Sequence, residues 1–246
     1  MLIVLSDIHL ADSESYNLNG RRYNHNLPSE VYFSFFKEIS EFIRDSDVKS
    51  IDLVLAGDIF EITRSGLWHG GQLRPYLHND EIVDGSEAET MVLKVLDAIT
   101  RDERVDATLT IFRRLSEYYQ KPVTIHFIPG NHDRLANSSQ LVRQRVQSLL
   151  GLEVNGSVFD NQYLQYNDGK PFVLVRHGHE YDHSNFSVDL RTWPEIPILI
   201  DKSYYDKPVL GDIVTVEIAS KLPFLFREYY GDESIIAMDD LLTLYN

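Results

Sequence analysis

Four clusters of polar residues follow apolar, strand-like runs at widely separated places in the chain. Each cluster offers carboxylate, imidazole or amide groups, which are hard or borderline ligands that suit Mn, Fe, Zn, Co or Ni. Because parallel strands end at the same edge of a sheet, we expect the clusters to meet there. The residues are Asp7 and His9, Asp58, Asn131 and His132, and His177 and His179.

The spacing of these residues indicates a pair of metal ions. Asp7 and His9 are separated by one residue, so a turning loop can direct both side chains to one ion. The carboxylate of Asp58 can bridge two ions about 3.5–4 Å apart. Such a pair would hold a phosphate and share an acidified water. We therefore expect two divalent metal ions, with Mn as the first expectation and Fe, Zn, Co or Ni as alternatives.

The elements that must position these residues alternate along the chain. Short apolar runs predict strands at 2–5, 51–56, 123–128 and 172–175, with shorter candidates near 152–154, 157–159 and 162–166. Helical spacing predicts helices at about 29–45, 86–119 with a break near 100–106, and 138–150. Long polar loops at 11–27 and 62–85 would shape access to the site.

The order of elements predicts an α/β fold. We expect a layered α-β-β-α sandwich of mixed sheets, with the metal site at the carboxyl ends of the strands. Residues 1–246 would form one domain, in which 184–246 make a mainly helical cap or C-terminal extension.

Composition excludes several classes of protein. The chain has 246 residues, no cysteine and a formal charge of −15, so disulfides and thiolate–metal sites are ruled out. The charge argues against long duplex nucleic acid and anionic membranes, because both need clustered Lys and Arg. The start of the chain lacks a signal-peptide pattern, and no run reaches about 18 apolar residues. We expect a cytoplasmic protein without a membrane span; its oligomeric state is left open.

The clusters resemble motifs one to four of the calcineurin-like metallophosphoesterase superfamily. They read Asp7-x-His9, Gly57-Asp58, Gly130-Asn131-His132-Asp133 and His177-Gly178-His179, in that order. One such motif is weak evidence, but four in order, each after a strand, are highly specific. The stretch from Gly57 to Glu61, and the pattern His177-Gly178-x-x-Tyr181-Asp182, are similar to the UDP-diacylglucosamine hydrolase branch, although that branch usually has Arg where His132 stands.

The resemblance implies a role for each matching residue. Asp7, His9 and Asp58 would hold the first metal, and Asp58, Asn131 and His177 the second. In the catalytic group, His132 would contact a phosphoryl oxygen or protonate the leaving group, and Asp133 would orient its neighbours. The implied reaction is hydrolysis of a phosphomonoester, phosphodiester or pyrophosphate bond by a metal-bridging hydroxide.

One motif of the superfamily is missing. Its fifth motif, Gly-His-x-His, completes both metal spheres, but no histidine follows His183. A chain truncated before this motif is our first explanation. Alternatively, His179, Asp182 or His183 supplies a substitute ligand or a hydrogen bond that orients a ligand, or one metal site is weak. A catalytically weak member that acts as a protein-binding scaffold is the alternative function.

Two arginines beside the motifs are candidates for substrate binding. Arg134 follows the third motif and Arg176 precedes the fourth, and guanidinium groups bind phosphate well. A structural ion pair is an equally good reading of either residue. The substrate would be a phosphorylated small molecule or a nucleotide-like compound.

Overall fold

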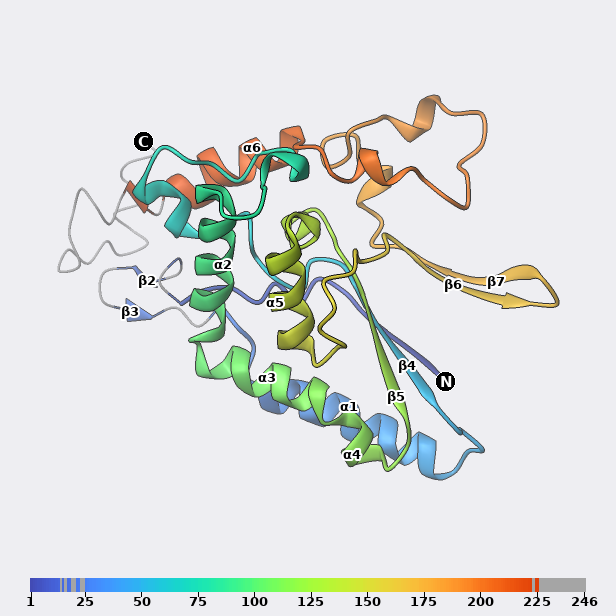
Figure 1. Ribbon diagram of the computed structural model, residues 1–246. Coiled ribbons are helices and arrows are strands. Elements are labelled where there is room, and N and C mark those ends of the chain that lie inside the picture. The colour runs from blue at the N-terminus through green and yellow to red at the C-terminus, as the bar shows by residue number, and fades with distance from the viewer. Residues whose placement is uncertain (14, 16, 19–20, 23–24, 223, 226–246) are drawn as a thin grey trace, which may run out of the picture.

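The centre of the molecule is a parallel sheet of three strands (Figure 1). The structure is a computed structural model that describes residues 1–13, 15, 17–18, 21–22, 25–222 and 224–225. Strands β1 (Leu2–Leu5), β4 (Ile51–Ala56) and β5 (Val123–Ile128) lie in the order β1-β4-β5. They have the bounds expected from the sequence, and their carboxyl ends share one edge.

Alternation along β4 gives the sheet two apolar faces. Leu53 and Leu55 belong to the main core, whereas Val54 and Ala56 belong to a smaller cluster on the opposite face. All four side chains are buried, as expected for the central strand of a parallel sheet.

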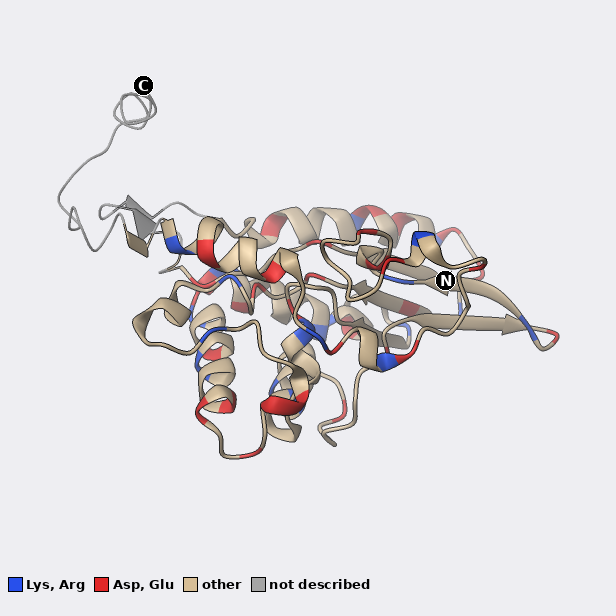
Figure 2. Ribbon diagram, turned by 90° about the horizontal axis from the view of Figure 1, so that it is seen from above, with Lys and Arg blue, Asp and Glu red and all other residues tan. Residues whose placement is uncertain are grey.

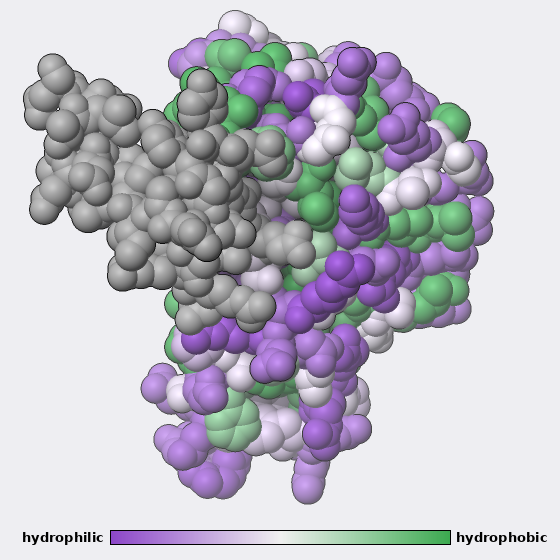
Figure 3. All heavy atoms as spheres, turned by 90° about the vertical axis from the view of Figure 1, so that its left-hand side faces the viewer, coloured by the Kyte–Doolittle hydropathy of each residue, from purple (hydrophilic) through white to green (hydrophobic). Residues whose placement is uncertain are grey.

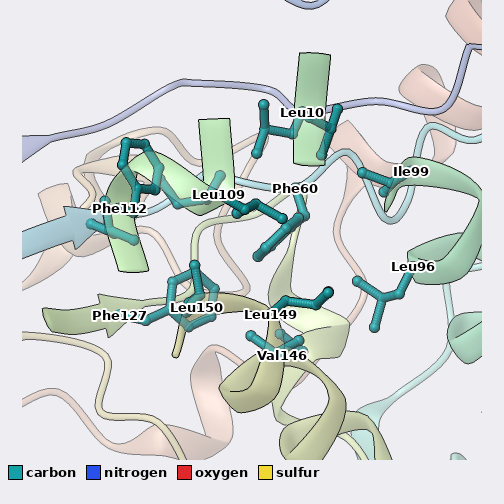
Figure 4. Close-up of a cluster of buried hydrophobic side chains, with 14 of the residues drawn as sticks. Leu10, Phe60, Leu96, Ile99, Leu109, Phe112, Phe127, Val146, Leu149 and Leu150 are labelled. Atoms are coloured by element: carbon teal, nitrogen blue, oxygen red, sulfur yellow. The ribbon is translucent and has the colours of Figure 1, made fainter. Parts of the chain in front are cut away.

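Helices supply the other side of the main core. They are α1 (Ser29–Arg44), α2 (Glu87–Thr100), α3 (Glu103–Arg113), α4 (Leu115–Tyr119) and α5 (Gln140–Leu150). Figure 4 shows side chains of α2, α3 and α5 packed around Phe60 and Phe127. The expected break in the long helix occurs where the Asp102 side chain accepts a hydrogen bond from Arg104 N and begins α3.

A second, antiparallel pair of strands projects from the body (Figure 1). Strands β6 (Tyr163–Asn167) and β7 (Lys170–Val175) form a hairpin, and Tyr163 and Val175 pack against the smaller cluster. A short hairpin also joins β2 (Asn17–Leu18) and β3 (Arg21–Arg22). The mixed α/β class is therefore confirmed, and the four-layer arrangement stays a prediction.

The strands expected near 152–154 and 157–159 do not form. The Gln147 side chain accepts hydrogen bonds from Asn155 N and Gly156 N, at 3.1 and 2.9 Å. The Asn137 side chain exchanges two hydrogen bonds with the backbone of Phe159. Because side chains take these backbone groups, the segment is held as a loop instead.

Residues 184–209 are less helical than expected. Between residues 184 and 209 the helical structure is limited to two short 3-10 turns, Leu190–Thr192 and Lys202–Tyr204. Helix α6 (Leu210–Val214) follows and continues into a π-helical turn, Thr215–Ser220. Residues 226–246 of the expected cap lie outside the described part. The domain assignment stays a prediction.

The surface reflects the acidic composition. Figure 2 shows Asp and Glu on helices and loops throughout the view. On the face drawn in Figure 3, hydrophobic residues lie among hydrophilic ones. Within the described residues, we find no helix with the length and apolar character needed to cross a membrane.

Candidate metal centre

The ends of β1 and β4 bend so that their polar residues turn toward each other. Asp7 N donates to the carbonyl oxygen of Gly57 at 3.1 Å, and His9 N donates to that of Asp58 at 2.9 Å. Asp7, His9 and Asp58 have φ angles of 55°, 53° and 53°, in the left-handed region that L-residues rarely adopt. The backbone is thus held in an unfavourable conformation where the predicted ligands begin.

Asp7, Asp58 and His177 bring their ligand atoms together from three segments. One ligand atom from each lies within 4.8 Å of the others. The ring atom Nε2 of His177 is 3.3 Å from Asp58 Oδ2 and 3.2 Å from the Asn131 side-chain oxygen. Four predicted ligands therefore converge on one place.

The orientation of the His177 ring suits a metal ligand. Its Nδ1 lies 2.9 Å from the carbonyl oxygen of Ala56, which can only accept, so Nδ1 carries the proton. If a metal ion took the place of the Nε2 proton, that nitrogen would present its lone pair to the cluster, as in metal-binding histidines. Burial lowers the pKa of His177, but the hydrogen bond and charge of Asp58 outweigh it and raise the pKa to about 9. The cluster thus favours a positive charge.

Two glycines allow the close approach of these groups. A Cβ atom on Gly57, where φ is 88°, would lie 2.3 Å from Cγ of His177. A Cβ atom on Gly130 would lie 2.3 Å from Oδ1 of Asp58. Any larger residue would displace a candidate ligand.

A second group joins His9 and His132 through a buried carboxylate that the sequence analysis did not assign. Glu61 is 1% exposed, with Oε1 at 2.7 Å from His9 Nδ1 and Oε2 at 2.8 Å from His132 Nδ1. One ligand atom from each of these three residues again lies within 4.8 Å of the others. The signal in the sequence was an acidic residue between the apolar Phe60 and Ile62.

Glu61 determines the charge of both rings. Burial alone would raise the pKa of Glu61, but its contacts with His132 and His9 hold that pKa far below the ordinary value. Burial would lower the pKa of His132, yet the hydrogen bond and charge of Glu61 raise it to about 9. The contact with Glu61 also raises the pKa of His9. With Nδ1 of His132 engaged by Glu61, the Nε2 N–H is the second donor of the charged ring.

Asp133 joins two loops instead of facing either group. It is fully buried, and its carboxylate accepts hydrogen bonds from Ile59 N, Phe60 N and Gly130 N at 2.8, 3.2 and 2.5 Å. Burial and the charge of Asp58 raise the pKa of Asp133 to about 6. This geometry fits an orienting role.

His179, Asp182 and His183, the candidate substitute ligands, lie outside both groups of ligand atoms found in the described part of the chain. The ring of His179 lies 5.2 Å from that of His177, beside Phe186 and Tyr205, and burial lowers its pKa to about 4. Asp182 accepts hydrogen bonds from Ser184 N and the Asn185 side chain, and the His183 side chain is 58% exposed.

The two candidate substrate arginines bond to protein groups. Arg134 is buried and donates to Asp212 and to residues of the loop 75–79. Arg176 donates to the Gln162 side chain and to the carbonyl oxygens of Pro197 and Ile198. A third arginine that the sequence analysis did not single out, Arg64, lies closer to the site, with Nη1 at 3.8 Å from Glu61 Oε1. The structure thus gives Arg134 and Arg176 structural contacts, and their role toward substrate stays a prediction.

The donor set fits divalent first-row metal ions. It combines carboxylates, imidazoles and one amide oxygen at the carboxyl edge of the sheet, without a soft sulfur ligand among the described residues. Carboxylates that repel one another and imidazoles with raised pKa values are the environment that a cation would stabilise.

Comparison with known proteins agrees with this geometry. The family model for calcineurin-like phosphoesterases matches residues 1–212, which include every residue of both groups. Neither the curated proteins nor the solved structures gave a match. Members of this family are metal-dependent phosphoesterases, and the matched segment covers most of the sequence. The chain therefore belongs to the calcineurin-like phosphoesterase family.

Proposed function

We propose that the protein hydrolyses a phosphoric ester with two divalent metal ions, Mn²⁺ being the first expectation. The observation that carries this proposal is the convergence of Asp7, Asp58 and His177 within 4.8 Å beside the His9–Glu61–His132 group. Asp7, His9 and Asp58 would hold one ion, and Asp58, Asn131 and His177 the other. Bound ions would polarise the phosphoryl group and lower the pKa of a water.

The residues of the chain would then orient and protonate the substrate. The Asp58 carboxylate is fixed because its Oδ1 accepts a hydrogen bond from His132 N at 2.9 Å. Glu61 holds the His132 ring by Nδ1 and keeps it charged, so Nε2 can donate to a phosphoryl oxygen or to the leaving group. This pair places a positive charge where negative charge develops in the transition state.

The substrate that we propose is a phosphorylated small molecule or a nucleotide-like compound. The charge of −15 does not favour a long polyanion. The bond cleaved is a phosphomonoester, a phosphodiester or a pyrophosphate, and a cytoplasmic location is part of the proposal. Arg64 is the guanidinium that we expect nearest to the phosphate, because its Nη1 lies 3.8 Å from Oε1 of Glu61, which also contacts His9 and His132.

Metal content and turnover test this function together. Elemental analysis of protein purified without chelator should find two equivalents of metal per chain. p-Nitrophenyl phosphate, bis(p-nitrophenyl) phosphate and ADP, each with Mn²⁺, separate the three bond types.

Asp58→Asn is the critical variant, because it removes the carboxylate shared by both sites. We expect it to lose metal and to lower turnover by at least about 100-fold. Asp106→Asn makes the same charge change at an exposed ion pair with Arg113, and it should keep both the metal content and the turnover of the unchanged protein. Full activity in Asp58→Asn would remove this residue as the bridge. Absence of metal and turnover in the unchanged protein would favour the scaffold alternative.

A further inference from the structure

Arg134 occupies an unusual position directly behind the candidate site. It follows Asp133 in the chain, and its side chain is 5% exposed. Its guanidinium donates to the carbonyl oxygens of Leu77 and Pro75, at 2.8 and 3.1 Å, and to the Asn79 side chain at 3.1 Å. A buried guanidinium needs a counter-charge as well as hydrogen bonds.

Asp212 of α6 supplies that counter-charge. Its Oδ2 accepts from Arg134 Nε at 3.0 Å and from Val209 N at 3.0 Å, and its side chain is 3% exposed. The planar fork of arginine can serve several acceptors at fixed angles, so the pair sets direction as well as distance. Helix α6 is thereby joined to the loop that carries the third motif.

The network extends through Asn79. Its side chain donates to the carbonyl oxygen of Arg134 at 3.2 Å and to Asp206 Oδ1 at 2.9 Å. Asp206 in turn pairs with Lys202 at 2.6 Å. Four segments that are distant in sequence thus meet in one hydrogen-bond network: the third motif with Arg134, the loop 75–79, residues 202–206 and α6.

The loop of the third motif is held at both ends. On one side, Gly130 N donates to the Asp133 carboxylate and His132 N donates to Asp58. On the other side, the network fixes Arg134, which is two residues from His132 and three from Asn131. An error of about 1 Å in the position of a reacting group can cost a factor of about 100 in rate. The second anchor therefore matters for chemistry as well as for folding.

We propose that Asp212 is a positioning residue: by holding Arg134, it fixes the loop that presents Asn131 and His132 to metal and substrate. The role of the loop in binding metal and substrate rests on the proposed function. The statement that Asp212 holds the loop rests on the hydrogen bonds alone. It makes α6 part of the working site, although none of its described residues belongs to either group of ligand atoms.

Hydrogen–deuterium exchange of the chelator-treated, full-length protein tests how the loop is held. Asp212→Asn removes the counter-charge and keeps the shape. We expect amides of residues 130–136 to exchange at least about tenfold faster, because local opening becomes easier. Asp106→Asn should leave that exchange unchanged. Exchange of this loop within twofold of the unchanged protein would overturn the proposal.

A double variant separates positioning from folding stability. Arg134→Gln with Asp212→Asn leaves no unpaired buried charge, so it should unfold at a higher temperature than Asp212→Asn. Glutamine has two N–H donors where the guanidinium has five, so it cannot make all of the contacts of Arg134 with Asp212, Leu77, Asn79 and Pro75, and loop exchange should stay fast. If the double variant recovered slow amide exchange in the loop together with its thermal stability, a positioning role would be contradicted. This variant also carries the test if Asp212→Asn fails to fold.

Titration of both variants with Mn²⁺ gives the functional readout. We expect the dissociation constant to rise at least about tenfold, measured below the unfolding temperature. Unchanged affinity with a fast-exchanging loop would refute the link between loop and site. If the unchanged protein binds no metal, the proposed function fails, and the exchange experiment still decides whether Asp212 holds the loop.

Discussion

Replacing Glu61 by glutamine keeps the shape of the buried side chain but removes the negative charge between His9 and His132. Burial lowers the pKa of His132, but the hydrogen bond and charge of Glu61 outweigh it and raise the pKa from 6.5 to about 9. That difference corresponds to about 3 kcal/mol in favour of the charged ring. The His132 side chain is 17% exposed, so screening by water is limited. We therefore expect Glu61→Gln to destabilise the metal-free protein by about 3 kcal/mol near pH 6.

The pH dependence gives this prediction its sign. Glu61, with a lowered pKa, contributes stability that is present above pH 4.5 and lost as the pH falls through its folded value. His132, with a raised pKa, contributes stability that is fully present below pH 6.5 and lost as the pH rises through about 9. The difference in unfolding free energy between the unchanged protein and Glu61→Gln should be largest between about pH 5 and 6.5. It should decrease to about 1 kcal/mol by pH 10.

Urea unfolding at pH 6 and pH 10, with chelator present, measures this gap. NMR titration of the His132 ring should show its pKa falling from about 9 in Glu61→Gln, because the hydrogen bond and charge that oppose burial most strongly are lost while the charges of Asp58 and Asp133 remain. Glu117→Gln, at an exposed ion pair with Arg114, is the control and should cost under about 1 kcal/mol. An equal gap at both pH values, or an unchanged pKa of His132, would refute the reasoning.

Three further variants, one of them with a matched control, separate strain, packing and chemistry. Gly57→Ala should push His177 away and weaken metal binding at least about tenfold, whereas Gly85→Ala, at a similar φ of 77° with open space around it, should cost about 1–2 kcal/mol and leave the metal bound. Leu96→Ala, in the buried core, should cost about 2–5 kcal/mol by urea unfolding without changing metal affinity. His132→Ala should lower turnover by about 100- to 10,000-fold and spare metal content; loss of metal would show that its role is wrong.

The sequence predicted the parts of the fold that depend on local pattern. Strands 2–5, 51–56 and 123–128 have the expected bounds, because each is a short apolar run closed by polar residues. The break in the long helix was expected and occurs at a side-chain cap, Asp102. The loop at 152–159 was not, because the side chains that hold it, Gln147 and Asn137, act across distances that a local pattern does not record.

For the candidate site, the sequence indicated which ligands converge but not how the surrounding side chains contact one another. Ligand types after successive strands indicated where Asp7, Asp58 and His177 would meet, since parallel strands share an edge. The bridging position of Glu61 depends on the rotation of two rings toward one buried carboxylate, which spacing does not specify. Likewise, the sequence could not tell a phosphate-binding Arg134 from a buried one, because its partner Asp212 is 78 residues away.

The left-handed backbone at Asp7, His9 and Asp58 has a consequence for how this protein can change. Each such conformation disfavours a residue with a Cβ atom by roughly 1–2 kcal/mol relative to glycine. A search for thermostable variants that considered the backbone alone would place glycine at all three positions and erase three candidate ligands. Selection for a more stable fold and selection for catalysis therefore act in opposite directions at this edge of the sheet. Thermostable variants should accordingly be sought elsewhere in the molecule.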